Sequence, residues 1–220
     1  MNTKSRAQRF DSASRWSAAL ALLAVGGLYF ALPEPLTAGP GWLSLAMVAG
    51  LLVPALVSFQ MRYLRVNEIL GYLISSLVTI ELIWSLVLLV RSLPGHQLSP
   101  QALLRSAAAL WFANILVFAS WYWRLDAGGP NARDLREEHT AGDFLFPQMT
   151  IDPDKCTLRV DAEWAPGYVD YLFLAFNTST AFSPTDVPVL SRWAKILMMV
   201  QSTISFTTVA LLAARAVNIL

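Results

Sequence analysis

Residues 168–217, YVDYLFLAFNTSTAFSPTDVPVLSRWAKILMMVQSTISFTTVALLAARAV, decide the expected fold. The apolar run at 168–176 is about half of what a bilayer-crossing helix needs, which is about 20 residues. A polar, turn-prone stretch follows at 177–186, and a long apolar helix is expected at 190–217. Non-helical backbone at membrane depth must be buried in protein or line a watery cavity. This order therefore predicts a short helix and loop that enter the membrane and return.

The order also resembles the pore domain of the potassium-channel superfamily, in which outer helix, short pore helix, filter loop and inner helix follow one another. The resemblance implies an outer helix at 102–123, a pore helix at 168–177, a filter-like loop at 178–186 and an inner helix at 190–217. The filter positions fall on Thr178, Ser179, Thr180, Ala181, Phe182 and Ser183. Asp186 would form a ring of acids at the pore mouth. Over its whole length the chain resembles a bacterial family of multi-pass inner-membrane proteins with such a pore-like C-terminus.

The loop departs from the potassium filter where that filter has glycines. Ala181 and Ser183 carry a Cβ, and a left-handed backbone costs such residues about 1 to 2 kcal/mol each. The resemblance therefore implies a homotetramer with a wider, weakly selective cation pore. The alternative is a polar loop packed between the helices of a non-conducting scaffold or accessory subunit.

The composition indicates an all-α integral membrane protein. Of 220 residues, 55% are apolar and only 14% are charged. The apolar blocks before the inner helix lie at 16–32, 42–59, 69–90 and 102–123. With the inner helix they predict five transmembrane helices plus the re-entrant pore helix and loop. The domains expected are a basic arm (1–15), a three-helix membrane region (16–90) and a pore-like module (102–220).

The pore-like module contains an acidic connector, residues 124–165, with nine acidic and five basic residues. Within it, residues 143–149 (DFLFPQM) are expected to lie on the membrane as an amphipathic segment. Asp170 is expected to cap the short helix, because an acid complements the positive end of the helix dipole.

Basic residues predict the orientation. The arm at 1–15 and the pair Arg62 and Arg65 should lie in the cytoplasm. With five spans, the connector and the basic pair Arg192 and Lys195 lie there too, so the loop enters from the cytoplasm. This direction of entry is opposite to that in potassium channels and similar to that in ionotropic glutamate receptors. If residues 166–182 cross completely, the chain has six spans instead.

Three polar residues of the inner helix share one face. Gln201, Ser205 and Thr208 follow one another at i, i+4 and i+7. A polar stripe of this kind is predicted to line the pore. The alternative is that these side chains bond to neighbouring helices.

Glu81 lies deep in the third apolar block, where an acid is costly unless it is paired or functional. Its depth matches that of Asn114 on the fourth block, and Arg105 is within reach, so both are candidate partners. The rival interpretation is a proton- or cation-binding site, which would make the protein a proton- or cation-coupled carrier.

Enzymatic function is not expected. His96 and His139 are the only histidines and have no metal-ligand spacing, and the single cysteine, Cys156, excludes a cysteine-cluster metal site. No cofactor is predicted, and a net charge of +1 gives no reason to expect nucleic acid. The expected partners are the lipid bilayer, further copies of the chain and monovalent cations.

Overall fold

The computed structural model describes residues 3–95, 98–134, 142–151, 164–183 and 186–217. In these residues the chain is helical, and its only extended pairing is an isolated antiparallel bridge between Phe144 and Val189. The long helices are α1 (Thr3–Phe30), α2 (Gly41–Gln60), α3 (Leu64–Gly95), α4 (Pro100–Leu125) and α7 (Arg192–Val217). The shorter ones are η1 (Glu34–Leu36), η2 (Asp126–Gly128), α5 (Pro130–Asp134), η3 (Pro147–Thr150) and α6 (Tyr168–Ala181).

Among the described residues, five helices are long and apolar enough to cross a membrane: α1, α2, α3, α4 and α7. The predicted all-α fold is confirmed in the described residues, and each of the five predicted spans corresponds to a helix that is long and apolar enough to cross a membrane. The short helix α6 has 14 residues, which corresponds to about 21 Å at 1.5 Å per residue. That is less than the roughly 30 Å of a bilayer core, so the structure gives no support to a sixth span.

Most helices extend beyond their apolar blocks. The first helix starts at Thr3, so the basic arm continues the helix of the first span and is not a separate segment. The third helix has 32 residues and is longer than the apolar block at 69–90. Its flanking residues include Leu64, Arg65 and Glu68, which favour helix. The length of an apolar block thus indicates how much of a helix suits the membrane, not where the helix ends.

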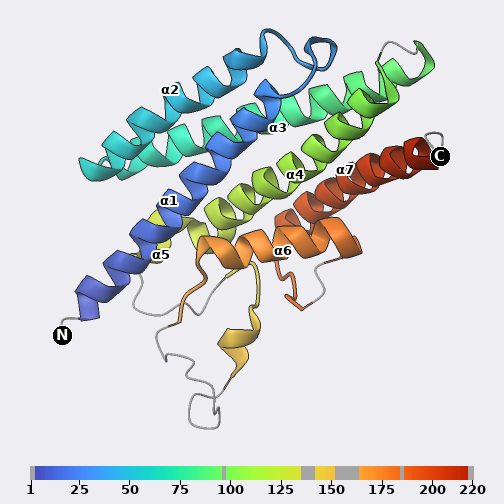
Figure 1. Cartoon of the computed structure of the whole chain (residues 1–220). Helices are drawn as coiled ribbons and strands as arrows, with labels where there is room; N and C mark the ends of the chain where they lie inside the picture. Colours follow the sequence, from blue (N-terminus) through green and yellow to red (C-terminus); the bar gives the residue numbers. More distant parts are fainter. Residues whose placement is uncertain (1–2, 96–97, 135–141, 152–163, 184–185, 218–220) are drawn as a thin grey trace.

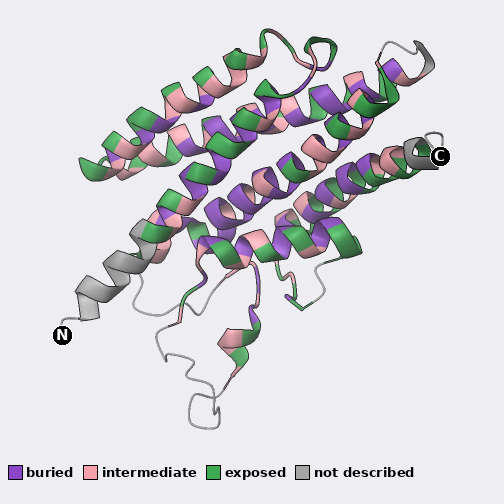
Figure 2. Ribbon diagram, in the orientation of Figure 1, coloured by how far each residue is buried: buried purple, intermediate pink, exposed green. Residues whose placement is uncertain are grey.

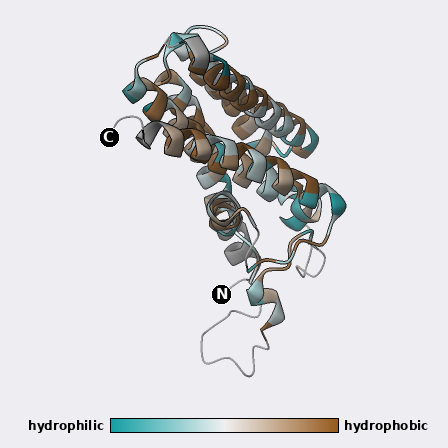
Figure 3. Cartoon of the chain, turned by 90° about the vertical axis from the view of Figure 1, so that its right-hand side faces the viewer, coloured by the Kyte–Doolittle hydropathy of each residue, from teal (hydrophilic) through white to brown (hydrophobic). Residues whose placement is uncertain are grey.

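Helix α4 forms the centre of the bundle. It packs against α1, α3, α6 and α7, while α2 completes the far side against α1 and α3 (Figure 1). Its C-terminal half is buried on nearly every side, as its purple colour shows in Figure 2. Hydrophobic residues run along the long helices in Figure 3, and hydrophilic ones gather near their ends and turns.

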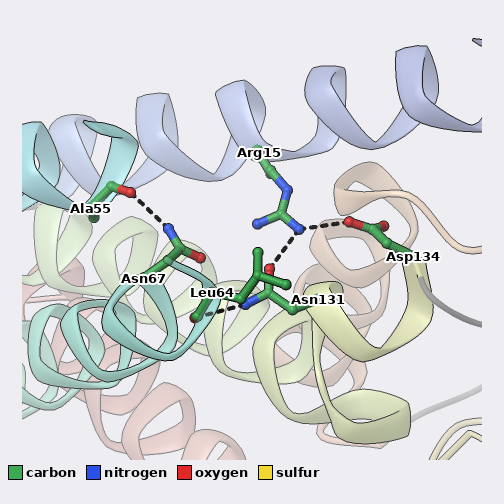
Figure 4. A network of polar contacts seen from close by, with 6 residues as sticks. All are labelled: Arg15, Ala55, Leu64, Asn67, Asn131 and Asp134. Atoms are coloured by element: carbon green, nitrogen blue, oxygen red, sulfur yellow. Dashed lines mark hydrogen bonds and ion pairs between the residues drawn. The ribbon is translucent and has the colours of Figure 1, made fainter. Parts of the chain in front are cut away.

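One end of the bundle brings together the end of α4, the connector and the start of α3. Arg15 on α1 donates to Asn131 Oδ1 at 2.9 Å and pairs with Asp134 at 2.8 Å (Figure 4). Asn131 in turn donates to the carbonyl of Leu64 at 3.2 Å. We call this end of the molecule the connector end. The chain starts beyond it and finishes at the opposite end (Figure 1), which agrees with an odd number of crossings.

Candidate functional site

The short helix α6 begins at the connector end. Near its start, the hydroxyls of Tyr168 and Ser120 lie 3.1 Å apart, and Tyr171 Oη donates to Asp126 Oδ2 at 2.5 Å. Asp170 Oδ2 accepts from the Gly167 amide at 2.7 Å, so the predicted cap is confirmed. Burial raises the pKa of the Asp170 carboxyl, although backbone hydrogen bonds act in the opposite direction.

The last turn of α6 lies level with the middle of two long helices. Ser179 there contacts Asn114, midway along α4, and Gln201 and Ser205, midway along α7. Farther on, the chain is back at the connector end, where the Leu190 amide donates to the Asp143 carbonyl at 2.8 Å. The chain therefore goes in about half the length of the bundle and comes out at the same end.

Gln201 anchors this last turn. Its Nε2 donates to the Ala175 carbonyl at 2.7 Å and to Ser179 Oγ at 2.9 Å. Its Oε1 accepts from Tyr122 Oη at 2.5 Å. One amide therefore joins α7 to both α6 and α4 with all three of its bonds buried.

Further buried bonds extend from the same point. Ser205 Oγ donates to the Ser179 carbonyl at 2.6 Å and accepts from Trp111 Nε1 at 3.0 Å. Asn114 Nδ2 donates to the Gln201 carbonyl at 3.3 Å and, at 3.4 Å, to Ser179 Oγ. We call these residues the central polar network: Trp111, Asn114, Tyr122, Ser179, Gln201 and Ser205.

The predicted pore lining is wrong for the three residues proposed. Gln201, Ser205 and Thr208 are each 0% exposed within a single chain. Thr208 Oγ1 bonds to the Ser205 carbonyl of its own helix at 2.8 Å. Helical spacing correctly placed the three on one face, but that face points at α4 and α6. The interpretation as bonds to neighbouring helices describes Gln201 and Ser205.

The filter-like loop begins later than predicted. Residues 178–181 continue α6, so the filter positions assigned to Thr178, Ser179, Thr180 and Ala181 lie in a helix. Thr178 Oγ1 bonds to the Leu174 carbonyl at 2.8 Å, and Thr180 Oγ1 bonds to the Phe176 carbonyl at 3.0 Å. Because such hydroxyls bond to the preceding turn, polar residues do not end the helix here.

The end of α6 is exposed, unlike Thr178 and Ser179 just before it. Thr180, Ala181, Phe182 and Ser183 are all exposed in the single chain. Phe182 ends the helix in the left-handed conformation, with φ of 56°. Its ring packs edge-on against that of Phe206 on α7, with centroids 5.8 Å apart. We call residues 180–183 the α6 tip.

Phe206 belongs to an exposed stripe on α7. The stripe consists of Arg192, Ile196, Met199, Thr203, Phe206 and Ala210. These residues repeat at alternate spacings of four and three, so they lie on one side of the helix. This outward stripe is opposite the central polar network, and apart from Arg192 and Thr203 it is apolar.

The described connector residues 143–146, part of the segment expected to lie on the membrane, pack against the end of the bundle. Asp126 is 0% exposed, and its Oδ1 accepts from the Asp143 amide at 2.6 Å. Asp143 Oδ1 accepts from Trp193 Nε1 at 3.0 Å, and Phe144 and Phe146 are buried. Sequence reasoning missed Asp126, Asp143 and Tyr171 as a group because they belong to three distant segments. Asp186 is exposed beside the buried Val187.

Glu81 has a different partner from those predicted. Its Oε1 accepts from Ser44 Oγ on α2 at 2.9 Å, whereas its buried Oε2 has no hydrogen-bond partner. Asn114 belongs to the central polar network, and Arg105 is exposed. The prediction compared depths in the membrane for the third and fourth apolar blocks only, whereas Glu81 faces α2.

Within the described residues, no group of three or more His, Cys, Asp or Glu could hold a metal ion. His96, His139 and Cys156 lie outside those residues. In comparisons with protein-family models, curated proteins and solved structures, nothing matches this chain.

Proposed function

We propose that the chain is one subunit of a homotetrameric, channel-like membrane protein that passes cations with weak selectivity. The observation that carries this proposal is the position of the α6 tip. It is exposed in the single chain, yet it follows a turn that bonds to the middle of α4 and α7. In a chain with five membrane-crossing candidates, that level corresponds to the interior of the bilayer.

Lipid cannot cover such a tip. The last four carbonyls of a helix have no partner within the helix, and unpaired backbone groups are not found facing hydrocarbon. The tip must therefore face protein or water. Other copies of the chain, arranged around an axis beside the tip and the outward stripe, would supply both. The number four and the arrangement about the axis come from the resemblance to the potassium-channel pore domain.

The charge pattern at the tip favours cations. The C-terminal end of a helix carries a partial negative charge, and in the assembly several such ends would converge on the axis. Hydroxyls of Thr180 and Ser183 are exposed at the tip and can help to solvate an ion. Met199 and Phe206 would narrow the path as an apolar constriction, a common gate in channels. These features favour a cation pore without the close ion contacts that strict selectivity needs.

The test is cation flux through purified protein in liposomes, comparing potassium, sodium and a large organic cation. Thr203→Trp on the outward stripe should reduce the flux strongly, and Phe182→Ala should change it. The matched control is Ile80→Trp, because Ile80 is 66% exposed on α3, away from the proposed axis. The mass of the detergent-solubilised particle should correspond to four chains. A monomer, or equal effects of the Thr203 and Ile80 variants, would sink the proposal.

A proton- or cation-coupled carrier is the second candidate. It is favoured by the buried Oε2 of Glu81, which has no hydrogen-bond partner. The same liposome assay separates the two candidates. The carrier is favoured over the channel if Glu81→Gln abolishes cation uptake while Thr203→Trp leaves it intact.

A further inference from the structure

Arg124 is a buried cation without a hydrogen bond. It lies in the last turn of α4, at the connector end, and is only 8% exposed. Its Nε has no partner, and among the described residues its guanidinium forms no hydrogen bond or ion pair. The guanidinium lies near two aromatic rings, Trp123 at 5.6 Å and Tyr72 at 6.0 Å, and the carboxylate of Glu68 acts on it electrostatically without forming an ion pair. Burying a charge is costly unless it is paired and hydrogen-bonded, so the position calls for an anionic partner.

The fold leaves space for this side chain on both sides. A Cβ at Gly71 would lie 1.6 Å from Arg124 Nη1, so the guanidinium fits against α3 only because residue 71 has no side chain. Beyond it is a small pocket of about 10 Å³. Its lining consists of Glu68, Arg124, Gly128, Gly129, Pro130 and Asn131. The volume suits about one water-sized group, such as one oxygen of a larger anion.

The surroundings match a phospholipid. The pocket lies at the connector end, which also carries the exposed Arg62 and Arg65. Lys and Arg concentrated at one membrane face attract anionic lipid headgroups. From the pocket, exposed apolar side chains of α3 lead toward the middle of the bundle: Ile69 is 59% and Leu73 is 52% exposed. A lipid with its headgroup at Arg124 would have its acyl chains along these residues.

We propose that the pocket at Arg124 is a binding site for the phosphate of an anionic phospholipid. One phosphate oxygen enters the pocket and accepts from the guanidinium, and the rest of the headgroup stays outside. Arginine suits phosphate because its donors form a fixed, planar fork. The site involves α3, α4 and the start of the connector, so it does not depend on whether the α6 tip forms a pore.

Glu68 offers a competing account of the same pocket. Its carboxylate is exposed, lines the pocket and acts electrostatically on Arg124, but it forms no ion pair with it. If Glu68 is the counter-ion, its removal leaves Arg124 unpaired and weakens the protein. If a phosphate is the counter-ion, removal of Glu68 takes away a repelling charge and strengthens lipid binding. The two accounts therefore differ for Glu68→Gln: the first predicts lower stability without lipid, and the second predicts stronger binding of the lipid.

The experiment is thermal unfolding of the purified full-length chain in a neutral detergent, with added phosphatidylglycerol or phosphatidylcholine. A ligand at ten times its Kd raises the midpoint of a chain of this length by about 3 to 6 °C. We expect that shift with phosphatidylglycerol and not with phosphatidylcholine. Arg124→Gln should abolish it, Glu68→Gln should keep or enlarge it, and the control Arg65→Gln, an exposed arginine at the same end, should keep it. Inorganic phosphate tests the free anion.

Each alternative outcome would overturn the proposal. Equal shifts with the two lipids mean that the headgroup charge is not recognised. A full shift in Arg124→Gln places the lipid elsewhere. If Arg124→Gln does not fold, the Glu68 variant decides: a lower midpoint without lipid, with no larger shift on adding phosphatidylglycerol, identifies Glu68 as the counter-ion. A full shift with inorganic phosphate alone makes the pocket a free-anion site and not a lipid site.

Discussion

Replacing Gln201 with leucine tests whether the polar face of α7 joins helices or lines a pore. Leucine has a similar volume but removes three buried bonds, to Ala175, Ser179 and Tyr122. Side-chain hydrogen bonds between membrane helices contribute about 0.6 kcal/mol each on average, which gives about 2 kcal/mol for the three. The Tyr122 hydroxyl also loses its acceptor, and an unpaired buried group adds about 1 to 3 kcal/mol. We therefore expect Gln201→Leu to cost about 3 to 5 kcal/mol.

The assay is thermal unfolding in detergent. At about 2 to 4 °C per kcal/mol for a chain of this length, the midpoint should fall by at least about 6 °C. The matched control is Thr203→Leu, two residues along the same helix. Thr203 is exposed, and its hydroxyl bonds only to the Met199 carbonyl of its own helix. Its replacement should change the free energy of unfolding by less than about 0.5 kcal/mol. Similar losses in both variants would refute the assignment of the two faces.

Thiol labelling is a second test of which face of α7 is in contact with water. In a Cys156→Ser background the chain has no other cysteine, so Gln201→Cys and Thr203→Cys can be compared directly. A charged, water-soluble thiol reagent should modify position 203 in the assembled protein and leave position 201 unmodified. Labelling at 201 with protection at 203 would show that the polar face lines the watery path after all.

Three further substitutions test other parts of the structure by the same unfolding measurement. The carboxylate oxygens of Asp126 now accept from two donors, the Asp143 amide and Tyr171 Oη. Asp126→Asn puts an amide there and should lower the free energy of unfolding by about 1 to 3 kcal/mol. An unchanged midpoint would mean that the connector is held by its aromatic residues alone. Gly71→Ala forces the buried guanidinium from its place and should cost about 1 to 3 kcal/mol through overpacking; no loss would place that side chain elsewhere. Glu81→Gln keeps an acceptor for Ser44 and removes the charge of a carboxylate whose second oxygen has no hydrogen-bond partner. The free energy of unfolding should therefore be unchanged or higher. A large loss would indicate an ion bound at the carboxylate.

The five long helices were predictable because a helix that crosses the bilayer needs about 20 apolar residues in a row, and other helices rarely have so many. Their ends were not. The third apolar block covers 69–90, but α3 runs over Leu64–Gly95, since polar residues at the membrane surface remain helical without any apolar signal. The end of α6 was misplaced for a related reason. Thr178 and Thr180 look like loop residues in sequence, but their hydroxyls bond within the helix.

Directions were harder to predict than positions. Spacing shows that Gln201 and Ser205 share a face of α7, but spacing is unchanged when the helix is rotated about its axis. What fixes the rotation is pairing with Tyr122 and Trp111 on α4, and no local pattern marks those residues as partners. The cluster of Asp126, Asp143 and Tyr171 was missed for the same reason. These contacts join segments that become neighbours only after the connector has folded back on the bundle.

The central polar network and the α6 tip have separate roles in the proposed channel. Gln201 and Ser205 bond to carbonyls of α6, so they hold a half-length helix at a depth where its own end stays exposed in the single chain. The tip and the outward stripe are then the surfaces left to face an axis. Variants of the network should therefore lose stability first and flux only as a consequence. Variants of the tip, such as Phe182→Ala, should alter flux while the unfolding midpoint stays close to that of the wild type. If network variants with wild-type stability changed ion selectivity, the ion path would run through the interior of the single chain and not between copies.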